Sequence, residues 1–394
     1  MTEPFPFSRR GFLSGAGALL GTAFLPTVSL AAGSDQSDWF TASENTIRKR
    51  RVLKEPLLLA PGEPMIDTDY IVPVDFKRTA PTHAITAHPS GLKVRNCRIL
   101  FETDKWLDRW QLPLAEQPMV GISSYVSGLC LPATRNVDID GLHIEGAPRV
   151  GIEGWDVSNL KIRRFSATRC YSGARFSENA GITDYALGNC FWDVSDVRIW
   201  DTWGPPGGYS SRVRPGGWVG GDCWISEGDR ASFRRMECSG EMFIGVKICR
   251  GRLIEMEDIT TPSIMFQGSS AVDPALEGLS WLYVNGLYLN AATGYGLGAD
   301  GANKVQISWN VVGHFENGYI VGNSADGNAI QATGNCHLDL RGFTIGGFNG
   351  RRGGLPACAL ELDEKPPPQL CTINGDFESV NTFFNQDLLV RRRA

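Results

Sequence analysis

Several patterns that mark common protein classes are missing from this chain. No long stretch repeats apolar residues at helical spacing, so a helical bundle is not expected. The net charge is −5 and no nucleic-acid-binding motif is present, so nucleic acid is not expected as a partner. The 10 cysteines form neither a Cys-x-x-Cys pair nor a cluster with histidine, which argues against structural zinc. We predict no metal site or cofactor and leave a calcium requirement open.

The residues Val137-Asp138-Ile139-Asp140-Gly141-Leu142-His143-Ile144 contain the pattern that organises the chain. Val137 and Ile139 are two residues apart and so lie on one face of a strand, and the same holds for Leu142 and Ile144. The polar pair Asp140-Gly141 separates them and indicates a tight bend. One such unit cannot bury its own apolar face, so it predicts stacked copies.

The pattern recurs along most of the chain. Further copies start at Leu92, Leu160, Trp192, Ala231, Ile254, Leu282 and Leu338, with poorer ones at Val305 and Cys371. Several starts are 23 residues apart, for example 137 to 160 and 231 to 254. A third strand per coil is visible eight residues after the signature, at Ile152, Val246 and Leu297. Parallel crossovers favour the right-handed form.

The sequence therefore predicts an all-β fold, a single-stranded right-handed parallel β-helix with inserted loops. We expect this domain to span residues 36–385. Residues 38–53 form a short amphipathic segment, for which we predict a helix that caps the open end of the solenoid. The last residues, 386–394, contain Arg391-Arg392-Arg393 and should form a flexible basic tail.

The N-terminus carries an export signal. Ser8-Arg9-Arg10-Gly11-Phe12-Leu13 precedes an apolar run from Ala16 to Leu30, which is rich in glycine and alanine. This is typical of a twin-arginine signal peptide, residues 1–31, with cleavage after Ala31 or Ala32. The alternative is an N-terminal membrane anchor, for which the run is short. We expect a periplasmic or secreted protein without a membrane partner after cleavage, and the twin-arginine translocase as its partner during export.

The cysteines and histidines have plain structural interpretations. Cys97, Cys238 and Cys336 fall at or beside core positions of the repeat, where cysteine acts as a small hydrophobic residue. His143 lies between core positions and should point to solvent. The other four histidines are isolated in sequence.

The coil that starts at Trp192 is enlarged from 23 to 39 residues by a long insertion, residues 200–219. Its aromatic and basic side chains suit sugar binding, because flat rings stack on sugar faces and guanidinium groups bind carboxylates or hydroxyls. The alternative is that the loop folds back on the helix as ordinary packing. The predicted substrate-binding residues of this loop are Trp203, Tyr209, Arg212, Arg214 and Trp218.

The coils beside this loop offer candidate catalytic residues. If Trp224 pairs with Val246, then Arg175, Asp222 and Lys247 come from three successive coils and converge in one outer groove. A lyase needs a base and positive charge to hold a developing enolate, which Lys247, Arg175 and Arg250 would supply. A hydrolase needs two carboxyl groups. Asp222 would be the first, with Glu178, Glu227 or Glu241 as the second.

On these residues the chain resembles the pectate-lyase-like right-handed β-helix superfamily. The resemblance rests on the stacked signature and on Pro61-Gly62 at the end of a first strand. Gly220-Gly221-Asp222-Cys223 is similar to the polygalacturonase element Gly-Asp-Asp-Cys, although Gly221 replaces one aspartate and no Gly-His-Gly follows in the next coil. Val246-Lys247-Ile248 is similar to that family's basic strand. The layout of twin-arginine signal, cap and β-helix resembles the exported β-helix proteins of colanic-acid gene clusters, which implies work on an exopolysaccharide.

The sequence thus predicts an exported enzyme that cleaves an acidic polysaccharide, with β-elimination slightly favoured. A glycoside hydrolase of polygalacturonase type is the first alternative. The second is a non-catalytic protein that binds glycan during exopolysaccharide assembly.

Overall fold

The fold was examined in a computed structural model of the chain. It describes residues 47–73, 75–77, 83–102, 126–177, 190–200, 202, 223–228, 230–239, 245–268, 279–289, 305–321, 329–333, 336–346, 351–352, 355–356, 360–362 and 372–380. Side chains of residues 190, 321, 333 and 346, and of those from 351 on, are not described. The chain divides into two units, Met1–Ile47 and Arg48–Ala394.

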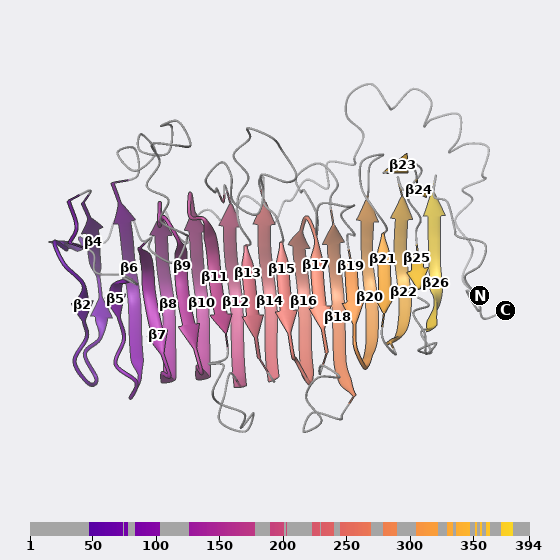
Figure 1. The fold of residues 1–394 in the computed structure, drawn as a ribbon, viewed down its shortest axis with the longest axis horizontal. Helices are drawn as coiled ribbons and strands as arrows, with labels where there is room; N and C mark the ends of the chain where they lie inside the picture. Colours follow the sequence, from indigo (N-terminus) through magenta and orange to yellow (C-terminus); the bar gives the residue numbers. More distant parts are fainter. Residues whose placement is uncertain are drawn as a thin grey trace. The chain divides into compact units, whose positions relative to one another are not determined.

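Arg48–Ala394 contains a parallel β-helix whose strands stack along one axis (Figure 1). We call its larger sheet, with 13 strands, sheet A. Its path along the axis is β1 (Lys49–Val52), β4 (Thr68–Val72), β6 (Leu92–Phe101), β8 (Arg135–Glu145), β10 (Ser158–Thr168), β12 (Cys190–Trp200), β14 (Arg230–Ser239), β16 (Leu253–Thr261), β18 (Ser280–Leu289), β20 (Val311–Val321), β22 (Cys336–Gly346) and β26 (Thr372–Val380), while β3 (Met65–Ile66) pairs with β6.

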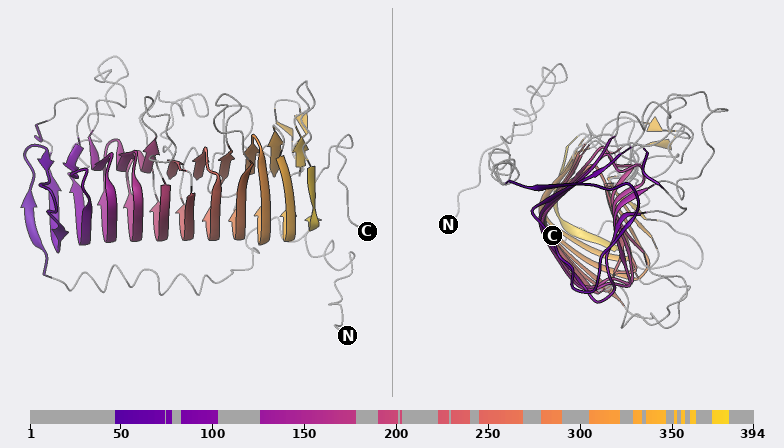
Figure 2. Two further views of the ribbon diagram at one scale, coloured as in Figure 1. Left: turned by 90° about the horizontal axis from the view of Figure 1, so that it is seen from below. Right: turned by 90° about the vertical axis from the view of Figure 1, so that its left-hand side faces the viewer.

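The second sheet, sheet B, has 11 parallel strands. Its order is β2 (Leu57–Leu58), β5 (His83–Thr86), β7 (Ser127–Pro132), β9 (Val150–Trp155), β11 (Ser172–Ser177), β13 (Trp224–Glu227), β15 (Val246–Cys249), β17 (Ile264–Gln267), β19 (Val305–Ser308), β21 (Ile330–Thr333) and β25 (Leu360–Leu362). A separate antiparallel pair joins β23 (Arg351–Arg352) and β24 (Leu355–Pro356). Seen along the axis, the parallel strands outline a closed ring (Figure 2). The predicted right-handed parallel β-helix is therefore confirmed.

The signature becomes one long strand of sheet A in each coil, and the polar pair becomes its corner. The second residue of the pair has a left-handed backbone, with φ of 52° at Asn96, 81° at Gly141 and 56° at Asp196. Glycine, asparagine and aspartate tolerate this conformation best, so their recurrence here has a steric cause. The same conformation recurs coil after coil, at Arg164, Arg235, Asp258, Gly286, Asn317 and Gly342.

The apolar residues of the signature fill the interior. Ile139, Leu142 and Ile144 have no exposed surface, and each buried side chain of this size contributes roughly 2 kcal/mol. Aromatic rings pack against one another inside the middle coils: the centroids of Phe176 and Trp224 are 5.4 Å apart with tilted planes, and those of Trp224 and Phe233 are 5.7 Å apart, edge to face. All seven cysteines whose side chains are described are buried, which confirms the core positions predicted for Cys97, Cys238 and Cys336.

Three expectations about the strands are wrong. Val305 does not start a copy of the signature, because β19 belongs to sheet B and the sheet A strand of that coil is β20. The last copy does not start at Cys371, since Ile373 pairs with Leu338. Residues 49–52, inside the predicted capping helix, form strand β1. Four other predictions concern residues outside the described part of the chain: residues 38–46 of the capping segment, Leu297, the signal peptide and the basic tail.

Candidate functional site

The described residues include Arg175, Lys247 and Arg250 of the predicted site. They also include Glu227, one of the candidate second carboxyl groups, which lies in β13 in register with Cys249. The other predicted residues lie outside the described part of the chain: Glu178, Trp203, Tyr209, Arg212, Arg214, Trp218, Asp222 and Glu241. Their positions relative to the groove therefore stay predictions.

Sheet B places Arg175 and Lys247 in one outward-facing row, which we call the basic row. Trp224 pairs with Val246, as expected, so β11, β13 and β15 are successive strands. Arg175 is in register with Ile225, and Ile225 with Lys247. Two coil spacings of ~4.8 Å therefore separate the two cations, a span of about 9.6 Å. Within the described part of the chain, neither side chain forms an ion pair.

Arg250 follows Lys247 at the end of β15. Its backbone is left-handed, with φ of 59°, and its side chain is exposed. Its backbone N–H donates to the carbonyl oxygen of Gln267 at 2.7 Å. Arg250 thus lies at the edge of the face that carries the basic row.

The row continues on its N-terminal side into a buried polar cluster that the sequence did not predict. Glu153 is in register with Arg175 and is only 8% exposed. Its carboxylate accepts a hydrogen bond from Ser127 Oγ at 2.8 Å and forms an ion pair with Arg149 Nη2 at 2.7 Å. His83 Nδ1 lies 3.7 Å from the same carboxylate. A buried carboxylate is stable only with such partners.

Burial dominates the electrostatics of this cluster. Burial lowers the pKa of His83, and Arg149 lowers it further, while Glu153 acts in the opposite direction. The buried atoms Nδ1 of His83 and Nε of Arg149 have no hydrogen-bond partner among the described residues. Burial, with a smaller contribution from Glu153, also raises the pKa of Cys130, which keeps this thiol protonated.

The chain is enlarged beside this face. Strand β6 ends at Phe101 and the next strand, β7, begins at Ser127; β12 ends at Trp200 and β13 begins at Trp224. Both long connections run from sheet A to the start of a sheet B strand. By contrast, β8 ends at Glu145 and β9 begins at Val150. The long insertions therefore join the chain next to the cluster and the basic row.

A second constellation resembles a catalytic triad but does not suit the chemistry. On the outer face of sheet A, His143 Nδ1 lies 2.8 Å from Ser166 Oγ, and His143 Nε2 lies 3.6 Å from a carboxylate oxygen of Glu145. Ser166 is only 1% exposed, which excludes a substrate. Burial lowers the pKa of His143 to about 4, with Arg98 and Arg169 adding to the effect, so the imidazolium that a general base becomes is unfavourable here. His143 thus faces outward as predicted, but its side chain is 13% exposed and is packed rather than solvated.

The N-terminal half of sheet A's outer face is joined by ion pairs between coils. Arg98 binds Asp69, Arg235 binds Asp196 through two hydrogen bonds of 2.6 and 2.9 Å, and Arg234 binds Asp193 at 2.6 Å. Both members of each pair belong to the scaffold. The arginines of these three pairs are therefore already bound to aspartates and are not available to an anionic substrate. They differ in this from Arg175 and Lys247 of the basic row on sheet B.

The described residues contain neither a candidate metal-binding cluster nor a candidate membrane-spanning helix. No group of three or more histidine, cysteine or acidic side chains is arranged to hold a metal ion there. In the same part of the chain, no helix has the length and apolar character needed to cross a bilayer.

Comparison with known proteins does not assign the chain to a family. No protein-family model, no curated protein and no solved structure matches it.

Proposed function

We propose that this protein is an exported enzyme that cleaves an acidic polysaccharide by β-elimination over the outer face of sheet B. The observation that carries the proposal is the basic row. Arg175 and Lys247 share one register row, and neither forms an ion pair among the described residues. Two such cations on an outer face suit the carboxylates of a uronate-containing chain.

The chemistry follows from the substrate. A base removes the proton from the carbon next to the uronate carboxyl group, and a cation stabilises the enolate that develops. The C–H electron pair then forms the C=C bond as the glycosidic C–O bond breaks, and the leaving oxygen takes up a proton. No water is consumed, and the new non-reducing end carries a double bond conjugated to the carboxyl group.

The two cations have different aptitudes for these roles. A guanidinium stays protonated in proteins and binds a carboxylate through a planar fork, so Arg175 is assigned to the uronate carboxylate. A lysine amine releases its proton far more readily than a guanidinium does, so Lys247 is assigned as the base. The two backbones are about 9.6 Å apart with Ile225 between them, so a sugar residue bound by both side chains lies over the outer face at Ile225.

Sequence features support the wider part of the proposal. The stacked signature and the Gly220-Gly221-Asp222-Cys223 element resemble the pectate-lyase-like superfamily, which implies a carbohydrate substrate. Ser8-Arg9-Arg10-Gly11-Phe12-Leu13 supports export by the twin-arginine translocase, to the periplasm or beyond. The resemblance to exported β-helix proteins of colanic-acid gene clusters makes a cell-surface exopolysaccharide the first substrate to test.

The test incubates the exported protein with uronate-containing polysaccharides and records the ultraviolet absorbance of the conjugated double bond. Lys247→Ala should lower kcat/KM by a factor of about 100 to 10,000, the usual contribution of a general base. Arg175→Ala should act chiefly on KM. Lys161→Ala is the matched control, because Lys161 is an exposed lysine on sheet A, and its activity should be unchanged.

Each other outcome points to a different function. New reducing ends without the double bond would replace elimination by hydrolysis, with Asp222 as the carboxyl group to substitute next. Binding without any product would make the protein a glycan-binding component of exopolysaccharide assembly. Full activity in both Lys247→Ala and Arg175→Ala would show that the reaction does not take place at the basic row.

A further inference from the structure

The outer face of sheet A changes character at β16. Up to β14 its carboxylates are bound by arginines of neighbouring coils, as at Asp193 and Asp196. From β16 on, Glu255, Glu257 and Glu316 are exposed, and none of them forms an ion pair among the residues that the structure describes. Three aromatic rings accompany them, at Trp281, Tyr283 and His314.

These rings form a cluster with a common orientation. The planes of Tyr283 and His314 differ by 13° with centroids 5.4 Å apart, and those of Trp281 and Tyr283 differ by 8° at 6.4 Å. Trp281 and His314 complete the triangle, with a plane angle of 10° at 6.4 Å. Trp281 and Tyr283 remain 39% and 40% exposed. We call these three rings with Glu255, Glu257 and Glu316 the aromatic shelf.

The strand register explains why the members of the shelf meet. Tyr283 on β18 pairs with Glu255 on β16 and with His314 on β20, so these three form one outward row. Asn285 likewise pairs with Glu257 and Glu316 in the next outward row. Each row therefore places an acidic side chain one coil, ~4.8 Å, from a neutral one.

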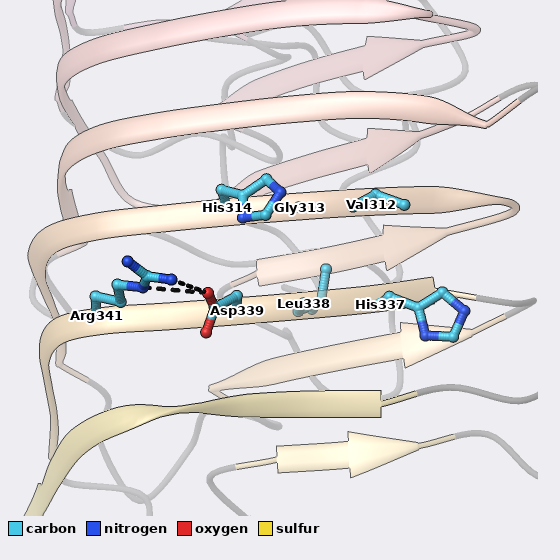
Figure 3. A pocket seen from close by; sticks show the side chains of 7 residues that line it. All are labelled: Val312, Gly313, His314, His337, Leu338, Asp339 and Arg341. Atoms are coloured by element: carbon cyan, nitrogen blue, oxygen red, sulfur yellow. Dashed lines mark hydrogen bonds and ion pairs between the residues drawn. The ribbon is translucent and has the colours of Figure 1, made fainter. Parts of the chain in front are cut away.

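The shelf borders a hollow of about 480 Å³, which includes Tyr283, His314 and the three glutamates in its lining. This volume lies within the range of small-ligand sites, about 300 to 1,000 Å³. A second hollow of about 210 Å³ shares His314 with it in its lining (Figure 3). There Arg341 donates to Asp339 at 2.9 Å, so that carboxylate is already bound.

We propose that the aromatic shelf is a second glycan-binding surface, which binds uncharged sugar residues. Exposed aromatic rings supply apolar area with little loss of conformational freedom, and they match the C–H faces of pyranose rings. Ionised carboxylates only accept hydrogen bonds, and sugar hydroxyls donate them. The three carboxylates form no ion pair among the described residues, and Arg234, which also lines the hollow, is bound to Asp193. The net negative charge repels uronates, so the anionic part of a polysaccharide belongs to sheet B and its neutral part to sheet A.

The surface around the aromatic shelf favours a ligand-binding role for the shelf over a purely structural one. Leu253, which pairs with Trp281, and Leu279 are 36% and 46% exposed. Together with the shelf they extend an apolar area over β16 and β18, and exposed apolar patches of soluble proteins often mark binding sites. A second copy of this chain fits less well, because a protein–protein contact here would bury three unpaired carboxylates.

The test measures binding of neutral hexose oligosaccharides by titration calorimetry and by quenching of tryptophan fluorescence. Trp281→Ala and Tyr283→Ala should each weaken binding at least tenfold. Phe191→Ala is the matched control, since Phe191 is an aromatic residue of sheet A that is 61% exposed and lies outside the shelf. This variant should bind the oligosaccharides as tightly as the unsubstituted protein does. The substituted side chains are exposed, so thermal unfolding should confirm intact folds.

A charge-neutral substitution separates the possible ligands. Glu255→Gln and Glu257→Gln keep hydrogen-bonding oxygens, so binding of neutral oligosaccharides should change by less than a few fold and should not depend on salt. Binding only of amino sugars, lost in both glutamine variants and at high salt, would overturn the proposal. So would binding of uronate oligosaccharides that Trp281→Ala abolishes, or no binding of any neutral oligosaccharide. None of these results depends on the lyase assay, since the elimination activity tests Lys247 and Arg175 on the other sheet.

Discussion

His143 Nδ1 lies 2.8 Å from Ser166 Oγ on the next coil, in a site where the imidazole is almost fully packed. The ring also stacks on Trp200, with centroids 6.1 Å apart. This arrangement holds the histidine neutral, because burial and nearby arginines lower its pKa to about 4. It therefore makes folding sensitive to acid.

The first prediction concerns this sensitivity. The unfolded chain protonates His143 near pH 6.5, whereas the folded protein does so only near pH 4, so the unfolded state binds more protons between these values. The contribution to stability is complete above pH 6.5 and is lost as the pH falls toward 4. The full effect is about 3 kcal/mol in the free energy of unfolding.

Denaturant unfolding of the wild-type protein and of His143→Gln across this pH range measures the effect. The variant is less stable at pH 7, but its stability should fall less steeply toward acid. A constant difference between the two proteins at all pH values would contradict the prediction.

The second prediction concerns the buried pair of Glu153 and Arg149. Glu153→Ala leaves the guanidinium of Arg149 buried without its carboxylate and should cost about 3 to 5 kcal/mol. Arg149→Met should lower the free energy of unfolding by a similar amount, because it leaves the buried Glu153 carboxylate without its ion-pair partner. The double variant Glu153→Ala, Arg149→Met should be more stable than the sum of the single changes implies. Additive losses in denaturant unfolding would show that the two side chains do not interact.

The third prediction tests the left-handed corner. Arg235 has φ of 51° and binds Asp196 with two hydrogen bonds on an exposed surface. Arg235→Gly removes an ion pair worth about 0 to 1 kcal/mol but also relieves a left-handed backbone that costs roughly 1 to 2 kcal/mol, so stability should change little. Arg235→Val also loses the ion pair, but it keeps the strained left-handed backbone, which a β-branched side chain tolerates poorly. Thermal unfolding should therefore rank glycine clearly above valine, and equal stabilities would refute the steric account.

The fourth prediction concerns the thiols. Burial raises the pKa of Cys97 to about 11 and that of Cys170 to about 12, so neither forms a reactive thiolate near neutral pH. All seven buried thiols in the described part of the chain should resist a thiol reagent in the native state and react after denaturation. Mass spectrometry of the modified peptides identifies them. Rapid native labelling of Cys97 or Cys170 would show that the interior is open.

The regular coils could be predicted from sequence because each contains the same unit. Val137 and Leu160 start clean copies and pair in register on β8 and β10. The coil of β20 was missed because glycines replace apolar residues there. A Cβ atom on Gly318 would lie 2.9 Å from the ring of Phe343, so the neighbouring aromatic fills that space instead. A glycine at a core position is not apolar enough to be recognised by the repeat pattern, so this coil could not be identified from the sequence.

The candidate site was predictable only in part. The pairing of Trp224 with Val246 follows from spacing, and with it the basic row. Glu153, Arg149 and Ser127 were missed because they come from different strands or turns, and no local pattern links Ser127 to a carboxylate 26 positions later. The aromatic shelf was missed for the same reason, since Trp281 and Tyr283 alternate with core residues as in any strand.

By itself, the sequence determined the repeating unit and the parallel β-helix, because both depend on the order and spacing of neighbouring residues. The tertiary structure decided which outward side chains meet. Stacking brings residues of successive coils within ~4.8 Å of one another, although paired residues are 18 positions apart at Val246 and Ile264 and 50 apart at Arg175 and Ile225. The register that places Arg175 beside Glu153, and Tyr283 between Glu255 and His314, exists only once the coils are stacked.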